Sequence, residues 1–166
     1  MLRMHALLRA ASKVRSRAYA PYSGFQVGAA VLAKGRIYAA CNVENSSYPL
    51  SICAERNAVA MAVAAGARKI DAVAIVGGTR RPAAPCGGCR QVLAEFCSPE
   101  TPVVYAAPDG QSVTTTLGAL LPSSFGPADI MGAARESTGT KRGPAGTSRS
   151  AARFRGTRSS GRRRSP

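Results

Sequence analysis

Residues 71–97 read DAVAIVGGTRRPAAPCGGCRQVLAEFC. The stretch 71–76 is typical of a buried strand, and the two glycines that follow it mark the end of that strand. Beyond Pro85, apolar positions recur at the spacing i, i+3, i+4 and i+7, which puts one helix face on a core: Cys89, Val92, Leu93 and Phe96. The segment therefore predicts a strand followed by a helix that packs against a sheet.

The rest of the chain continues this alternation. Residues 53–65 form an alanine-rich helical stretch that stops at Gly66, and residues 4–19 have the spacing of an amphipathic helix that Pro21 ends. Four further strands fall into two hairpins: 26–33 with 36–43, and 101–106 with 112–116. The order helix, hairpin, helix, strand, helix, hairpin predicts an α/β fold with one mixed sheet of about five strands covered by helices.

The length and the histidine count restrict the chemistry. A chain of 166 residues suffices for one domain, and a deep site between two domains would need a second copy of the chain. His5 is the only histidine, so a metal site built from several imidazoles within one chain is excluded. Any transition-metal site must use thiolates and carboxylates, which directs attention to the five cysteines.

The net charge of +15 is unevenly distributed. Residues 1–126 hold 13 Lys and Arg against 6 Asp and Glu, or +7, whereas residues 127–166 hold 10 against 2, or +8. From Gly132 onward Phe154 is the only large apolar residue, so this part cannot bury enough surface to offset its ordering entropy. We expect a catalytic domain at 1–130 and a basic, disordered tail at 131–166. The charge of the tail is the one feature that suggests contact with nucleic acid, and nothing else in the sequence supports it.

No stretch approaches the roughly 18 consecutive apolar residues of a membrane helix, and the apolar positions of residues 1–14 are spaced rather than continuous. We therefore expect a cytoplasmic protein without a membrane segment. In that compartment cysteines serve more often as ligands or nucleophiles than in disulfides.

Three cysteines lie at the predicted starts of two helices. Cys53 opens the segment Cys-Ala-Glu, and Cys86 and Cys89 belong to the segment Pro-Cys-Gly-Gly-Cys. Helix N-termini favour thiolate over thiol, and the two glycines let both sulfurs of the second segment face one point. Three thiolate ligands leave a tetrahedral zinc ion one position for water, which is typical of a catalytic site.

Charged residues next to these cysteines also fit a catalytic zinc site. Three thiolates on Zn²⁺ carry a net formal charge of −1, which Arg56 and Arg90, directly after the ligand segments, would offset. Glu55, two residues after Cys53, would lie beside the metal-bound water as a general base.

Other interpretations of the cysteines are open. A lone Cys-x-x-Cys also fits a redox pair or half of a four-cysteine structural zinc site, with Cys41 or Cys97 as fourth ligand. A small buried thiol explains Cys41 and Cys97 better, and a redox pair leaves Cys53 and Glu55 unexplained. These comparisons favour catalytic zinc.

The two cysteine segments resemble the zinc signature of nucleoside and base deaminases. Three further stretches resemble the small homotetrameric cytidine deaminases: YSGFQVGAA at 22–30, NVEN at 42–45 and LLPSSFG at 120–126. The match is collinear over about residues 4–130. The basic tail has no counterpart in it.

This resemblance implies a three-layer α-β-α fold, a homotetramer with shared sites and one zinc ion per subunit. It also implies hydrolytic deamination of cytidine and deoxycytidine in pyrimidine salvage. Cys53, Cys86 and Cys89 would be the zinc ligands and Glu55 the proton shuttle. The resemblance further assigns substrate contacts to Phe25, Asn42, Glu44, Tyr48, Ala54 and Phe125, the last in a neighbouring subunit's site. Arg56, Arg90 and Gln91 would lie beside the thiolates.

Three alternative functions share some of these features. One is a deaminase of cytosine-containing antibiotics or of free base, and another is a polynucleotide deaminase, which the basic tail suggests. Against the latter, no interleaved aromatic and basic residues are evident near the site. A third rival, a non-catalytic zinc module with a nucleic-acid-binding tail, predicts a fourth protein ligand.

Overall fold

The computed structural model describes residues 2–130, so the predicted tail at 131–166 lies outside the described residues. In chain order the elements are α1 Leu2–Arg15, β1 Gly28–Ala33, β2 Arg36–Cys41, the 3₁₀ turn η1 Tyr48–Leu50, α2 Ala54–Ala64, β3 Ala72–Val76, α3 Gly87–Ala94, β4 Pro102–Ala106, β5 Ser112–Thr116 and α4 Leu117–Leu120. All predicted helices and strands are present, and η1 and α4 are additional.

The strands form one mixed five-stranded sheet in the order β2-β1-β3-β4-β5. β3 and β4 are parallel, and the other neighbouring pairs are antiparallel. The parallel pair requires a crossover connection, which contains α3. The predicted sheet is thus confirmed.

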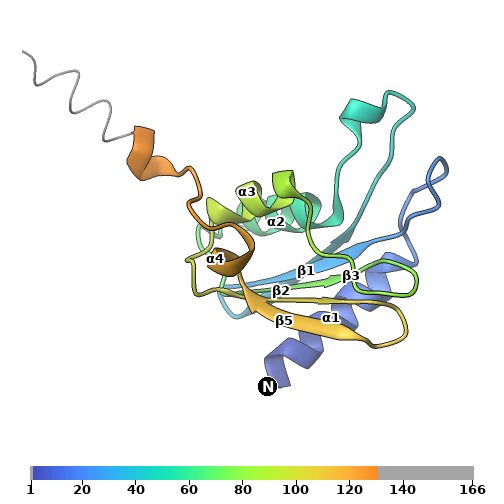
Figure 1. Cartoon of the computed structure of the whole chain (residues 1–166), viewed down its shortest axis with the longest axis horizontal. Coiled ribbons are helices and arrows are strands. Elements are labelled where there is room, and N and C mark those ends of the chain that lie inside the picture. The colour runs from blue at the N-terminus through green and yellow to red at the C-terminus, as the bar shows by residue number, and fades with distance from the viewer. Residues whose placement is uncertain (1, 131–166) are drawn as a thin grey trace, which may run out of the picture.

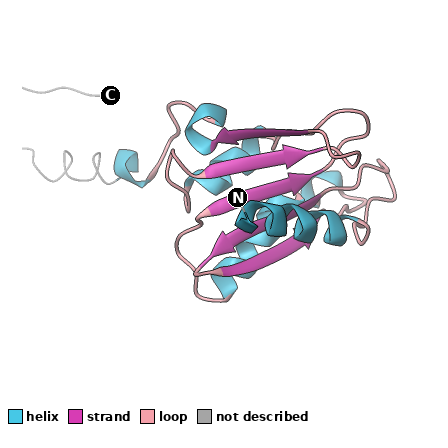
Figure 2. Ribbon diagram, turned by 90° about the horizontal axis from the view of Figure 1, so that it is seen from below, coloured by secondary structure: helices cyan, strands magenta, loops and turns pink. Residues whose placement is uncertain are grey.

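Helices cover the two faces of the sheet in three layers. Figure 1 shows α2 and α3 together on one side of the sheet and α1 on the other, and Figure 2 shows α1 lying across its own face. Alternate residues of β3 divide accordingly: Val73 and Ile75 belong to the core under α2 and α3, whereas Ala74 and Val76 belong to the core under α1. The three-layer α-β-α architecture is confirmed.

The close packing of α1 on the sheet depends on a glycine. A Cβ built on Gly28 would lie 2.0 Å from the carbonyl oxygen of Ala11 and 2.8 Å from the amide nitrogen of Arg15. Only a residue without a side chain allows this approach of helix and strand.

Two predicted boundaries were wrong for the same reason. The first helix ends at Arg15 rather than Tyr19, and β2 ends at Cys41 rather than Val43. Tyr19 instead donates its amide to the Asn42 carbonyl (3.1 Å) and accepts from the Glu44 amide (2.8 Å). Pairing between segments distant in the sequence therefore overrides the local helical pattern.

The two helices on the site face begin at the same end of the sheet. α2 stops before Gly66, whose φ of +83° fits the predicted helix end.

In the part of the chain that the structure describes, no helix combines the length and the apolar character needed to span a membrane.

Candidate metal and substrate site

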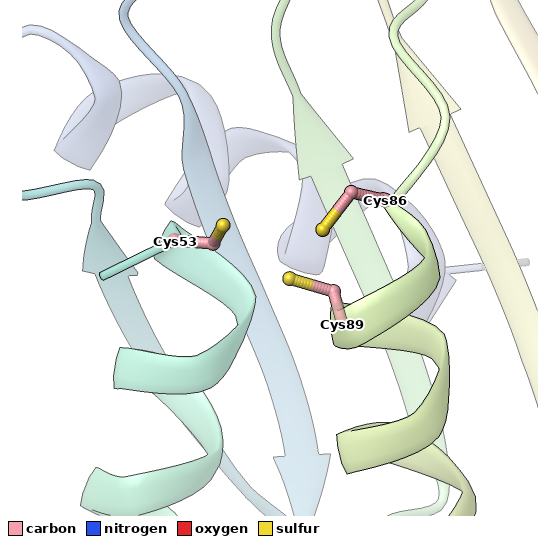
Figure 3. A group of neighbouring side chains, drawn as sticks. All are labelled: Cys53, Cys86 and Cys89. Carbon is pink, nitrogen blue, oxygen red and sulfur yellow. The ribbon is translucent and has the colours of Figure 1, made fainter. Parts of the chain in front are cut away.

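Three thiols converge where α2 and α3 begin (Figure 3). Cys53 is the N-cap of α2 and Cys86 the N-cap of α3, and neither uses its side chain to cap its own helix. Cys89 follows in the first turn of α3 and is fully buried. The three Sγ atoms lie within 4.8 Å of one another.

This donor set fits zinc. A tetrahedral ion with Zn–S bonds of about 2.3 Å holds its sulfurs about 3.8 Å apart, which is compatible with a cluster whose sulfurs lie within 4.8 Å of one another. Cys41 and Cys97 do not belong to the cluster that the described residues form. The arrangement therefore offers three thiolates and leaves a fourth position to another ligand.

Electrostatics favour a thiolate at the cluster. The pKa of Cys53 falls to about 6. The main cause is the hydrogen bond that the Cys89 thiol donates to the Cys53 sulfur, and the charge of Arg56 adds a smaller effect. Burial and Glu55 oppose the shift. The same hydrogen bond, with burial, raises the pKa of Cys89. Of these two thiols, Cys53 therefore loses its proton more readily.

Glu55 is the second residue of α2 and only 5% exposed. Burial raises the pKa of its carboxyl, although its own backbone amide and the Cys89 thiol favour the charged form. A carboxyl whose pKa is moved toward neutrality is suited to accept and return a proton.

A cavity of about 170 Å³ lies directly over these groups. Cys53, Glu55 and Cys86 line it on the side of the helix starts, and apolar residues form its walls: Phe25, Val27, Ala54, Ile75, Ala83 and Ala84. Phe25 is 44% exposed, so it lies at the rim rather than in the core. We call this space the inner chamber.

A second, more polar cavity of about 350 Å³ adjoins the first, and we call it the outer chamber. The two share Phe25, Asn42 and Cys53 as lining residues. The outer chamber adds Ser23, Val43, Glu44, Tyr48, Ser51 and Ile52. Together the chambers suit a flat apolar group near the thiols that is linked to a polar group farther out.

Asn42 and Glu44 bind the backbone of the segment that carries Phe25, a residue that lines both chambers. The Asn42 side chain accepts a hydrogen bond from the Val27 amide (2.8 Å) and donates one to the Phe25 carbonyl (2.9 Å). The Glu44 carboxylate accepts from the backbone amides of Tyr22 (2.9 Å) and Ser23 (3.3 Å) and from the Ser23 hydroxyl. The Ser23 hydroxyl is the main cause that lowers the pKa of Glu44.

The remaining predicted residues are more dispersed. The Arg90 guanidinium donates to the carbonyls of Pro85 and Leu120, both at 2.8 Å, and thus braces the loop before Cys86 against α4. Gln91 donates to the Phe125 carbonyl (2.7 Å), and the Phe125 ring is 60% exposed outside both chambers.

Sequence reasoning gave no role to Ser23 or to the Ala83–Ala84 wall. Ser23 stands inside the quoted stretch 22–30, but its partner Glu44 is 21 residues away. Ala83 and Ala84 follow β3, whose central place in the sheet only the folded topology defines.

Comparisons with known proteins agree with this site. A family model described as the cytidine and deoxycytidylate deaminase zinc-binding region matches residues 1–106. The cytidine deaminase of Sporosarcina psychrophila is 47% identical over 131 residues, which cover 78% of this chain and 96% of that protein.

Solved structures give the same result. The cytidine deaminase of Burkholderia pseudomallei superposes with a TM-score of 0.70 at 49% identity, covering 73% of this chain and 98% of that one. The cytidine deaminase of Mycobacterium tuberculosis gives 0.64 at 41% identity, covering 74% and 96%. The chain is therefore an enzyme with a zinc-binding domain and belongs to the cytidine and deoxycytidylate deaminase family.

Proposed function

We propose that this protein catalyses the hydrolytic deamination of cytidine and deoxycytidine to uridine and deoxyuridine, with release of ammonia. The observation that carries the proposal is the placement of Glu55 in one small cavity with the thiols of Cys53 and Cys86. The names of the relatives support the substrate class.

Cys53, Cys86 and Cys89 would hold one zinc ion per subunit. Zinc, when bound there, supplies the Lewis acidity that makes a water molecule nucleophilic near neutral pH. Arg56 would offset the charge of the thiolates, which agrees with its effect on Cys53. Arg90 would act on the site by fixing the loop that carries Cys86, and Gln91 by fixing the segment of Phe125.

Glu55 would carry the protons of the reaction. Its carboxylate accepts one proton from the water and passes it to N3 of the pyrimidine ring, which makes C4 more electrophilic. The water oxygen adds to C4, and Glu55 then moves the second water proton to the exocyclic amine, so that the C4–N bond breaks and ammonia leaves. The apolar inner chamber excludes competing water during these transfers.

The two chambers would divide the nucleoside between them. Phe25 and Ala54 would contact the base in the inner chamber, and Asn42, Glu44 and Tyr48 the sugar in the outer one. An amide and a carboxylate are suited to bind sugar hydroxyls. This polar chamber is the reason to prefer a nucleoside over the free base.

The proposal also covers the oligomeric state, the cellular compartment and the domain bounds. Phe125, whose ring is exposed, would close the site of a neighbouring subunit in a homotetramer. The five free cysteines suit a reducing compartment, so we place the protein in the cytoplasm, where it would serve pyrimidine salvage. Residues 1–130 would form the catalytic domain, with 131–166 as a tail outside it.

The test is ultraviolet monitoring of the purified full chain with cytidine, deoxycytidine, cytosine and an oligodeoxycytidine. We expect turnover of both nucleosides, slow or no turnover of the base and the oligonucleotide, and loss of activity with a zinc chelator that added zinc restores. No turnover of either nucleoside by zinc-loaded protein would refute the proposal. Preferential turnover of the oligonucleotide would favour a polynucleotide deaminase instead.

A further inference from the structure

The Ser23 hydroxyl connects the two chambers of the site. It donates to Oε1 of Glu44 in the outer chamber and accepts from the backbone amide of Phe25 (2.9 Å), whose ring lines both chambers. The direction of these bonds is fixed, because an amide can only donate and an ionised carboxylate can only accept. A single hydroxyl group thus joins the carboxylate to the backbone that carries the ring.

The hydrogen bonds of Glu44 leave one carboxylate oxygen with spare capacity. Oε2 accepts from the amides of Tyr22 and Ser23, which occupies both of its lone pairs. Oε1 accepts only from the Ser23 hydroxyl among the described residues. A sugar hydroxyl that binds Glu44 must therefore share Oε1 with Ser23.

We propose that Ser23 is a positioning residue that holds Oε1 of Glu44 toward the sugar, so that the enzyme selects substrates by their sugar hydroxyls. This inference rests on the proposed function, because it assigns a sugar to the outer chamber. Without the serine hydroxyl, the carboxylate keeps its two amide donors but loses the bond that sets the direction of Oε1. The Phe25 amide loses its acceptor at the same time.

The role of Ser23 differs from that of Asn42. The Asn42 side chain binds the Val27 amide and the Phe25 carbonyl, so the segment around Phe25 keeps two anchors when Ser23 is changed. We therefore expect the inner chamber and its chemistry to persist in a Ser23 variant, and the defect to appear in sugar recognition.

The experiment compares cytidine with 2′,3′-dideoxycytidine, which lacks both ring hydroxyls. For Ser23→Ala we expect the KM for cytidine to rise about 10-fold, as for loss of a hydrogen bond to a charged group, with kcat within about 2-fold. The KM for the dideoxy analogue should change little, so that discrimination between the two falls. Ser23→Thr, which keeps the hydroxyl, should restore most of it.

Two controls separate this role from a general loss of structure. Ser16→Ala removes an exposed hydroxyl after α1 that lines neither chamber and, among the described residues, bonds only to the Lys13 carbonyl; it should leave both substrates unaffected. Zinc content and thermal unfolding should match the unaltered protein. If Ser23→Ala fails to fold, Ser23→Cys, which keeps the size with a weak donor, provides the same comparison.

The proposal is overturned if Ser23→Ala, or Ser23→Cys in its place, leaves the cytidine-to-dideoxycytidine ratio unchanged. It is also overturned if kcat falls equally for both substrates, which would indicate a structural role. Failure of the proposed function has a different signature, because the unaltered protein itself would then turn over neither substrate.

Discussion

Cys53 and Cys86 occupy equivalent positions in two helices: each is the N-cap, with φ and ψ of −68° and 153° for the first and −67° and 165° for the second. Both sulfurs therefore leave the chain just before the positive end of a helix dipole. Cys89 adds a third sulfur from the first turn of α3. Two of the three sulfurs in the cluster thus come from the same local feature, a cysteine at a helix N-cap.

The cluster predicts which cysteines hold the metal. Replacing Cys53, Cys86 or Cys89 by serine should each reduce bound zinc from about one ion per subunit to a small fraction of that, because two thiolates bind zinc far less tightly than three. Zinc content after dialysis is the measurement. Cys41→Ser and Cys97→Ser, outside the cluster, should keep their zinc; its loss in either would support a structural four-cysteine site.

Glu55→Gln separates metal binding from proton transfer. The amide cannot accept and return a proton, so we expect kcat to fall by about 10³-fold or more while zinc content stays at the level of the unaltered protein. Glu95→Gln, an exposed carboxylate at the end of α3, is the matched control. Turnover of Glu55→Gln within a few-fold of normal would contradict the assigned role.

Glu44 should make stability depend on pH in the acid range. Its pKa is lowered in the folded state, chiefly by the Ser23 hydroxyl, so its contribution is present above the ordinary carboxyl pKa of about 4.3 and lost as the pH falls through the folded value. The free energy of unfolding should therefore exceed that of Glu44→Gln at pH 7, and the difference should shrink as the pH falls below the ordinary carboxyl pKa.

This comparison is made on metal-free protein, so that release of zinc in acid does not enter; protonation of Cys53 is common to both proteins. Glu100→Gln, an exposed carboxylate in the turn before β4, should show no such narrowing. A difference between the proteins that is constant with pH would show that the Glu44 charge does not stabilise the fold.

Gly28→Ala should destabilise the domain by about 2–3 kcal/mol, because the new methyl group meets the backbone of α1 at Ala11 and the helix cannot yield without losing its packing. Urea unfolding measures the change. At Gly126 nothing lies within 4 Å of an added Cβ, so Gly126→Ala should have little effect. Equal stability of the two variants would contradict the close packing of α1 and β1.

Phe125 provides a test of shared sites. Phe125→Ala should lower activity by about 10-fold or more, whereas Ile130→Ala, a similarly exposed apolar residue of the same segment, should not. Mixed oligomers of Phe125→Ala and Glu55→Gln subunits should regain activity, since one supplies Glu55 and the other the phenyl ring. No regain after subunit exchange would indicate that Phe125 acts within its own chain or not at all.

The sequence suffices to predict the elements that carry the chemistry. Two patterns define α2 and α3: the alanine-rich run before Gly66 and the periodic apolar residues after Pro85. Once these helices are predicted, the positions of the cysteines in the sequence place them at the helix starts. The two short elements were not predicted, because α4 spans four residues and η1 three, too few for a periodicity to emerge.

Contacts between distant segments were beyond sequence reasoning. The early end of α1 depends on the pairing of Tyr19 with the chain beyond β2, and the hydroxyl bridge at Ser23 depends on a carboxylate 21 residues away. Arg90 was expected to balance thiolate charge, yet its guanidinium binds two backbone carbonyls. Such partners are set by the folded topology rather than by local spacing.

The placement of the three thiols on two helix starts also bears on how the domain holds together. A metal held by Cys53 and Cys86 would act as a cross-link that closes a ring of chain containing α2, β3 and the loop before α3. Closing such a ring restricts the chain, so loss of the ion would lower the free energy of unfolding of the domain and not only disturb its catalytic end.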